Sequence, residues 1–262
     1  MDPAIGEVFS WHDHGGEQHY SDKPKGAKQP SLSTINQPRL YRISAVYDGD
    51  TVTLDRKIRV RLLGVNTPEL QQRGRGAEPF GETAAKWLRK KLLNRSVRVI
   101  YDVERKDRYG RHLAHLFTAQ GEHINLSLVA QGLAFVSTVP PNTLHLESLL
   151  NAEKEAITRK LGLWAHPRYQ AKEVGRFVES LHGKGWYRLT GKVQSLAMFS
   201  WGTELTLHSK LKVRLLKKHN QPLPNYESYL GKPIEVRGWL SVKSGYYSIR
   251  VRHPSRILLP DY

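Results

Sequence analysis

The chain has 262 residues, a formal net charge of +17 and no cysteine. The absence of cysteine excludes disulfides, thiolate metal sites and a cysteine nucleophile. No run of 18 apolar residues occurs, so we expect no insertion into a membrane. Residues 38–183 carry 24 basic and 15 acidic groups, and residues 184–262 carry 14 and 4. The positive charge is therefore spread over two regions, which indicates a polyanionic partner. The alternative is that the charge serves solubility alone.

Residues 1–37 are expected to form a small hairpin module followed by a linker. Two strand-like runs flank His14, Gly15 and Gly16, a combination typical of a β-hairpin. The module resembles a small domain of bacterial envelope proteins through Phe9, Trp11, Asp13, Gly16, His19, Tyr20, Ser21, Asp22 and Pro24. This resemblance assigns no chemistry, and the partner of the module stays open. Residues 1–5 do not show the pattern of a signal peptide.

A strongly β pattern begins after the linker, in a predicted domain over 38–166. Three strands, an amphipathic helix, two strands and two helices follow in order over Tyr41–Tyr47, Thr51–Leu54, Lys57–Leu63, Pro79–Leu93, Val97–Tyr101, His112–Phe117, Asn125–Gln131 and Leu144–Lys160. Strands that close into a small barrel with helices outside are typical of the OB fold. The fold class is therefore predicted to be α+β.

A second, mainly β and OB-like domain is predicted over 185–262, after a linker or helix over 167–184. The helix is expected at Ala171–Leu181. Five strands are expected at Tyr187–Leu196, Glu204–Leu207, Lys212–Leu216, Ile234–Leu240 and Tyr246–Arg252, with a short helix around Asn225–Leu230. The segment Gly231–Leu240 looks like the C-terminal module of some proteobacterial thermonuclease homologues.

Basic and aromatic residues alternate along the strands of this second domain, a pattern suited to single-stranded nucleic acid. The aromatic candidates are Trp186, Tyr187, Trp201, Tyr246 and Tyr247, and the basic ones include Lys212, Arg214 and Arg250. We interpret Lys212, Arg214, Tyr246 and Arg250 as the binding set. Trp239 lies at the centre of a strand and is expected in the core. The alternative is a merely basic scaffold.

Three polar clusters in the first domain suit phosphodiester hydrolysis, which needs charge neutralisation and a positioned water. Asp48-Gly49-Asp50 forms a turn whose carboxylates could reach one hard cation, or simply accept backbone hydrogen bonds. Glu69 follows Pro68 directly after a strand, as a catalytic or an ordinary surface carboxylate. Arg61 and Arg111 could grip one phosphate through bidentate contacts that lysine does not reproduce.

Residues 39–164 resemble the staphylococcal nuclease (thermonuclease) family in these clusters and in the order of elements. The resemblance implies that Arg61, Glu69 and Arg111 are catalytic, with Glu69 as the general base that orients water. It also implies a Ca²⁺ site, with Mn²⁺ and Mg²⁺ as alternatives, formed by Asp50, Asn66 and the Thr67 carbonyl, with Asp48 acting through water. Arg108 and Tyr109 are the implied substrate-binding residues, and Asp107 is expected to orient their loop.

Two departures from the family alter these expectations. Asn66 stands where the family has a carboxylate, so we expect weaker calcium binding or a different preferred metal. Thr138 and Pro140 stand where the family has two tyrosines that stack on the nucleotide. Because stacking contributes ~1–3 kcal/mol per base, nucleotide affinity or base preference should differ from that of the family.

The leading hypothesis is a metal-dependent, sugar-nonspecific nuclease, periplasmic or secreted, that cleaves DNA and RNA. Products with a 3′-phosphate are what the resemblance implies. The alternative is a catalytically weak or inactive nucleic-acid-binding protein that uses the two OB folds. A third hypothesis is a scaffold that binds another protein through its N-terminal module.

Overall fold

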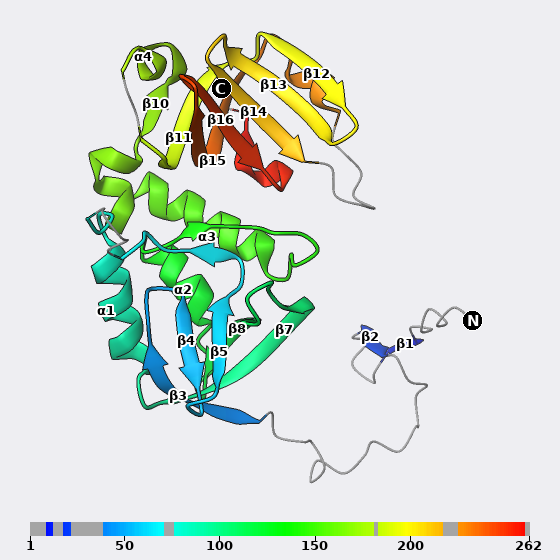
Figure 1. The fold of residues 1–262 in the computed structure, drawn as a ribbon. Helices are drawn as coiled ribbons and strands as arrows, with labels where there is room; N and C mark the ends of the chain where they lie inside the picture. Colours follow the sequence, from blue (N-terminus) through cyan, green and yellow to red (C-terminus); the bar gives the residue numbers. More distant parts are fainter. Residues whose placement is uncertain are drawn as a thin grey trace. The chain divides into compact units, whose positions relative to one another are not determined.

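The computed structural model describes residues 9–12, 18–21, 39–70, 76–180, 183–216 and 225–259. The chain divides into two compact units, Met1–Pro38 and Arg39–Tyr262. In the first unit, β1 (Phe9–His12) pairs antiparallel with β2 (Gln18–Ser21), as Figure 1 shows. This pairing is the predicted hairpin. The turn and linker predicted for this unit lie outside the described residues.

A closed barrel and three helices form the first half of the second unit (Figure 1). The barrel order is β3 (Leu40–Val46), β4 (Thr51–Leu54), β5 (Ile58–Leu62), β8 (His112–Thr118) and β7 (Ser96–Lys106). The helices are α1 (Gly81–Leu92), α2 (Ile124–Ala130) and α3 (Leu146–Thr158). Fully buried apolar side chains from strands and helices form one core, as alternation along the strands predicted. In the described part of the chain, no helix is long and apolar enough to cross a membrane.

The strand register brings the polar clusters to one end of the barrel. Thr51, next to Asp50, lies opposite Arg61 in the antiparallel pair of β4 and β5. Arg61 also lies opposite Leu113 in the parallel pair of β5 and β8, so Arg111 enters from the adjoining turn. The short strands β6 (Val65–Asn66) and β9 (Phe135–Val136) pair antiparallel, with Asn66 opposite Phe135. The segment after β9 therefore begins beside Gly64, whose carbonyl accepts from the Ser137 N–H.

The second half of this unit is one mixed sheet, which confirms a second, mainly β domain. Its strands pair in the order β10 (Ala171–Glu173), β11 (Gly185–Lys192), β15 (Pro233–Lys243), β16 (Tyr246–Val251), β14 (Leu211–Leu216), β13 (Gly202–His208) and β12 (Ser195–Phe199), with β17 (Ile257–Leu258) on β15. The predicted short helix is the 3₁₀ turn η4 (Tyr226–Tyr229). The exact boundaries predicted for the four domains and linkers stay predictions.

The helix predicted over Ala171–Leu181 is wrong in its first turn. Residues 171–173 form β10, which pairs parallel with β11, and only Val174–Glu179 form a helix, α4. The Glu173 carboxylate accepts hydrogen bonds from the backbone N–H groups of Gly175 and Arg176 at 2.8 and 2.9 Å. This cap fixes the start of the helix, and sheet pairing overrides helix propensity before it.

Several aromatic side chains of the second domain lie elsewhere than predicted. Trp239 is 41% exposed, because Gly238 takes the inward position on β15 and faces Ile249. Trp186 is only 3% exposed and stacks on Phe135 of the barrel domain with ring centroids 3.9 Å apart. Tyr187 and Tyr247 are buried as well. Trp239 is therefore not a core residue, and Trp186, Tyr187 and Tyr247 are not part of an exposed binding face.

A buried carboxylate joins the two domains. Glu153 of α3 is 1% exposed and accepts a hydrogen bond from the Val136 backbone N–H at 2.8 Å. Its other oxygen accepts from Arg237 of β15 at 2.9 Å and from Arg256, which follows β16, at 3.1 Å. Two arginines from one domain thus depend on one carboxylate from the other.

Glu153→Gln should destabilise the protein by about 3–5 kcal/mol, the usual effect of removing one partner from a buried ion pair. The loss arises because the buried Arg256 loses its ion-pair partner, while Arg237 keeps only Glu235. The measurement is the free energy of unfolding in urea. The matched control is Glu155→Gln on the same helix, whose exposed pair with Arg159 should add little. Equal effects of the two substitutions would contradict the structural role of Glu153.

Three histidines pack together beside the barrel. His115 is buried, its Nδ1 lies 3.1 Å from Nε2 of His123, and its ring centroid lies 4.9 Å from that of His145. Burial, followed by the neighbouring His123 and His145, lowers the pKa of His115 to about 3, against a small opposing effect of Asp102. Burial and His145 lower the pKa of His123 to about 4.

The free energy of unfolding should therefore fall as the pH drops from about 6.5 towards 4. Over that range His115 and His123 bind protons in the unfolded chain, where the ordinary pKa of histidine is about 6.5, but they stay neutral in the folded protein. Urea unfolding at about pH 7.5 and 4.5 measures the drop. His115→Gln should make the drop smaller, and an unchanged drop in this variant would show that the acid sensitivity has another source.

Candidate active site

The Asp48–Asp50 turn is packed tightly against its surroundings. The Asp50 N–H donates to Asp48 Oδ1 at 3.0 Å, so one oxygen of Asp48 serves the turn itself. A Cβ on Gly49 would lie 2.6 Å from Thr67 Cγ2 and 2.7 Å from Ala84 Cβ of α1. Position 49 therefore requires glycine, because a side chain there would collide with Thr67 and Ala84. The glycine lets the turn contact both Thr67 and the first helix.

The Asp50 carboxylate is 5% exposed and lies at the centre of the site. It accepts from the Thr67 N–H at 3.1 Å and the Thr51 hydroxyl at 3.1 Å, and it pairs with Arg61 Nη2 at 2.9 Å. Burial raises its pKa to about 6; Arg61 opposes this shift and the Asp48 carboxylate adds to it. The buried carboxylate is therefore short of positive charge even beside an arginine.

Arg61 is held in one orientation by the chain that follows it. Its Nη1 donates to the carbonyls of Leu62 and Val65, both at 2.8 Å, and its Nη2 donates to Asn66 Oδ1 at 2.8 Å. The Asn66 amide nitrogen in turn donates to the Thr67 carbonyl at 3.2 Å. The one side-chain oxygen of Asn66 is thus used by Arg61, and its NH₂ group lies against a carbonyl predicted to bind metal.

Arg111 is oriented by Asp107, in the role predicted for that aspartate. Arg111 Nε donates to Asp107 Oδ2 at 2.8 Å, and the Arg111 N–H donates to Asp107 Oδ1 at 3.0 Å. Burial alone would raise the pKa of Asp107, but the hydrogen bonds from Arg111 and the Tyr109 N–H outweigh it and lower the pKa. Within the described residues, the terminal nitrogens of Arg111 form no hydrogen bond with this carboxylate.

The two arginines line the same cavity, which has a volume of about 450 Å³. Arg108 and Tyr109, the predicted substrate-binding residues, line it as well. Arg252 reaches this cavity from the C-terminal domain and was not among the predicted site residues. The alternation of basic residues along its strand was a signal, but nothing in the sequence showed that this face meets the barrel.

Glu69 is partly buried, and its backbone is fixed by Glu78. The Glu69 N–H donates to Glu78 Oε2 at 3.0 Å, and the Glu78 N–H donates to the Glu69 carbonyl at 2.9 Å. Within the described residues, the Glu69 carboxylate has no hydrogen-bond partner. It is two residues from Thr67, but no contact between its carboxylate and Arg61 or Arg111 is found there.

The oxygen donors around Asp50 suit a hard cation in kind, because carboxylate and carbonyl oxygens are its preferred ligands. A cation in addition to Arg61 would also reduce the repulsion between the buried Asp50 carboxylate and the partly buried Asp48 carboxylate. Among the described residues, no group of three or more His, Cys, Asp or Glu side chains is arranged so that it could hold a metal ion. The oxygen donors therefore fit a divalent cation in kind, but they carry little negative charge.

The members of the predicted binding set on the second domain lie together. Lys212, Arg214, Tyr246 and Arg250 line one cavity of about 500 Å³ on the outer face of the sheet. Lys212 and Arg214 both pair with Glu204, at 2.6 and 2.9 Å, which offsets part of their charge.

The closed five-stranded barrel brings two arginines to one cavity beside a buried aspartate, an arrangement chemically suited to binding a phosphate ester. The family model described as "Staphylococcal nuclease homologue" matches residues 59–166. The thermonuclease of Staphylococcus intermedius is 39% identical over 135 residues, which cover 50% of this chain and 80% of that protein. The thermonuclease of Staphylococcus hyicus is 34% identical over 142 residues, covering 53% and 83%.

Endonuclease YncB of Bacillus subtilis is 29% identical over 170 residues, which cover 62% of this chain and 78% of that protein. The chain belongs to the staphylococcal nuclease family, as its motifs indicated. These comparisons support a nuclease, an enzyme that hydrolyses phosphodiester bonds.

Asn66→Asp should raise the affinity for Ca²⁺ on the order of tenfold, since affinity follows the number of charged ligands. An aspartate has two oxygens, so one could accept from Arg61 while the other is left for a cation. Titration calorimetry of the full chain with Ca²⁺ measures the change. Asn151→Asp on the exposed surface of α3 adds the same charge elsewhere and should leave the affinity unchanged. A similar gain in both variants would mean that only net charge matters.

Proposed function

We propose that the chain is a metal-dependent nuclease that hydrolyses DNA and RNA with little regard to the sugar. The observation that carries this proposal is the convergence of Arg61 and Arg111 on one cavity, beside the buried Asp50 carboxylate. A phosphodiester repels nucleophiles through its anionic oxygens, and two fixed guanidinium groups offset that charge.

Preorganisation is the contribution of the two arginines. Arg61 is fixed by two backbone carbonyls and Arg111 by Asp107. Neither group has to be reoriented when negative charge develops on the phosphate, so their attraction is available to the transition state. The carbonyls of Leu62 and Val65 hold Arg61 without neutralising it.

Glu69 is proposed as the general base. Its carboxylate would accept the proton of the attacking water, whose oxygen forms the new bond to phosphorus. The P–O5′ bond would break as this bond forms, and the leaving 5′ oxygen would take up a proton from solvent. Asp50 and the Thr67 carbonyl would hold a divalent cation, Ca²⁺ with Mn²⁺ or Mg²⁺ as alternatives, and Asp48 would act through water. When bound, such a cation supplies further neutralisation of the phosphate charge.

The finer assignments rest on the family resemblance. These assignments are that the products carry a 3′-phosphate and that the protein is periplasmic or secreted. Arg108 and Tyr109 are proposed to contact the substrate, because both line the cavity of the two arginines.

A second candidate function is nucleic-acid binding with little or no catalysis. The orientation of Asn66 favours it, since the amide NH₂ lies against the Thr67 carbonyl and weakens the cation site. The role of the N-terminal module, including a protein scaffold, stays a separate hypothesis.

Digestion of plasmid and single-stranded DNA and of RNA, with Ca²⁺, Mn²⁺ or EDTA, tests the proposal. Cleavage should require a divalent cation. Glu69→Gln should lower the rate by about 10²- to 10⁴-fold, the usual contribution of a general base. Arg111→Lys should lower it by about 10²- to 10³-fold through loss of a preorganised donor.

Glu82→Gln, on the exposed surface of α1, is the matched control and should cleave as the parent does. Undiminished cleavage in EDTA or by the Glu69→Gln variant would refute the metal-dependent mechanism. Salt-sensitive binding without cleavage in any metal would establish the second candidate function instead.

A further inference from the structure

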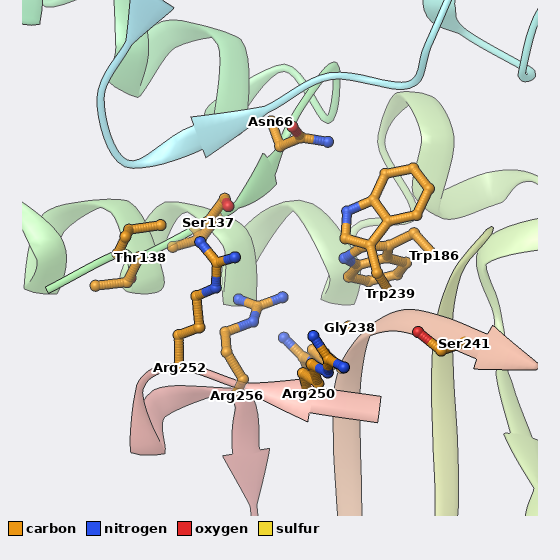
Figure 2. A pocket seen from close by; sticks show the side chains of 13 residues that line it. Asn66, Ser137, Thr138, Trp186, Gly238, Trp239, Ser241, Arg250, Arg252 and Arg256 are labelled. Atoms are coloured by element: carbon orange, nitrogen blue, oxygen red, sulfur yellow. The ribbon is translucent and has the colours of Figure 1, made fainter. Parts of the chain in front are cut away.

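A second cavity, of about 350 Å³, lies where the two domains meet (Figure 2). Asn66, Ser137 and Thr138 line it from the barrel domain, and Trp239, Arg250 and Arg252 line it from the outer face of the C-terminal sheet. We call it the junction cavity. Its lining combines a large aromatic side chain with several cations.

The cations of the junction cavity are only partly neutralised. Arg250 and Arg252 are exposed and form no ion pair within the described residues. Arg256 also lines the cavity; its Nη1 donates to Glu153, but its Nη2 is buried without a hydrogen-bond partner in the described structure. A buried donor without a partner is unfavourable, and an anionic oxygen in the cavity would satisfy it.

Trp239 supplies an apolar surface at the same place. It is 41% exposed, although large aromatic side chains are usually buried when a core position is available. Figure 2 shows its indole among the side chains that line the cavity, and Trp239 lies opposite Trp186 in the pair of β15 and β11. An exposed indole beside free guanidinium groups is the combination that binds an unpaired base and its phosphate.

The junction cavity is continuous with its neighbours. Ser137, Val139 and Arg252 line both it and the cavity of Arg61 and Arg111. Ser241 and Arg250 line both it and the cavity of Lys212 and Tyr246. A strand bound at the two catalytic arginines could therefore continue across the C-terminal sheet.

We propose that the junction cavity is a subsite for single-stranded nucleic acid, in which Trp239 stacks on an unpaired base while Arg250, Arg252 and Arg256 bind a phosphate. This inference builds on the proposed nuclease function, because it extends the substrate path beyond the catalytic arginines. The strand is single because a base in a duplex does not expose its face to an indole.

Equilibrium binding of a fluorescent single strand of about twelve nucleotides tests the role of Trp239. The full chain carries Glu69→Gln to prevent cleavage, and an abasic strand of equal length serves as the second probe. Trp239→Ala should weaken binding of the normal strand by about 5- to 150-fold and leave the abasic strand unchanged. Trp239→Phe should restore most of the affinity. Phe199→Ala, an exposed aromatic on β12, is the control and should bind both strands normally.

The arginines are tested by the double variant Arg250→Ala/Arg252→Ala. It should weaken the binding of both strands. It should also make the plot of log affinity against log salt concentration less steep, by an amount equivalent to about two phosphate contacts. Arg95→Ala/Arg176→Ala removes equal charge from exposed positions outside the three cavities and should change the slope less.

Equal losses for the normal and abasic strands in Trp239→Ala would overturn the stacking assignment. Equal effects of the two double-arginine variants would overturn the phosphate assignment and leave only general charge attraction. These measurements do not depend on cleavage. If the protein proves inactive with every metal, the nuclease proposal is refuted, but the binding measurements still show whether the junction cavity binds a single strand.

Discussion

The buried Glu153 carboxylate is the constraint on which the arrangement of this protein depends. It connects helix α3 with the backbone of β9 and with Arg237 and Arg256 of the C-terminal sheet. Because a buried charge must keep its partners, the sheet face with Arg250 and Arg252 is held against the open end of the barrel. The stacked rings of Phe135 and Trp186 strengthen the same contact. The proposed substrate path thus depends on the Glu153 carboxylate, which does not line the junction cavity, although its partner Arg256 does.

In the proposed function, Arg61 and a divalent cation would compete for the same oxygens. Arg61 already binds Asp50 and Asn66, and the amide at position 66 has no second oxygen to offer. A carboxylate at position 66 could accept from the guanidinium with one oxygen and bind a metal with the other. It would also make the cavity less positive. With asparagine, the balance moves towards a stronger attraction for phosphate and a weaker one for divalent cations. The structure therefore gives a physical meaning to the departure at Asn66.

Local patterns in the sequence predicted the barrel and its polar clusters well, because strand alternation and turn residues act over a few positions. The family motif predicted which arginines converge, and the register of β5 with β8 explains why. The predictions that were wrong concerned residues whose positions depend on contacts between segments distant in the sequence. Nothing near Trp186 or Trp239 in the chain says which of them meets the barrel, and β10 forms only because β11 lies beside it. Arg252 was missed for the same reason, since it lines the cavity of Arg61 and Arg111 only because the two domains pack together.

The segment between Ser137 and Asn142, which lines both the junction cavity and the cavity of Arg61 and Arg111, is anchored at both ends. The Ser137 N–H donates to the Gly64 carbonyl at 2.9 Å, and the Asn142 side chain bonds both backbone groups of Glu104, at 2.8 and 2.9 Å. A wall fixed in this way loses little conformational entropy when a ligand arrives. The chain ordered on binding is then mainly the nucleic acid, so the stiffness of the incoming strand, rather than that of the protein, sets the entropic part of recognition.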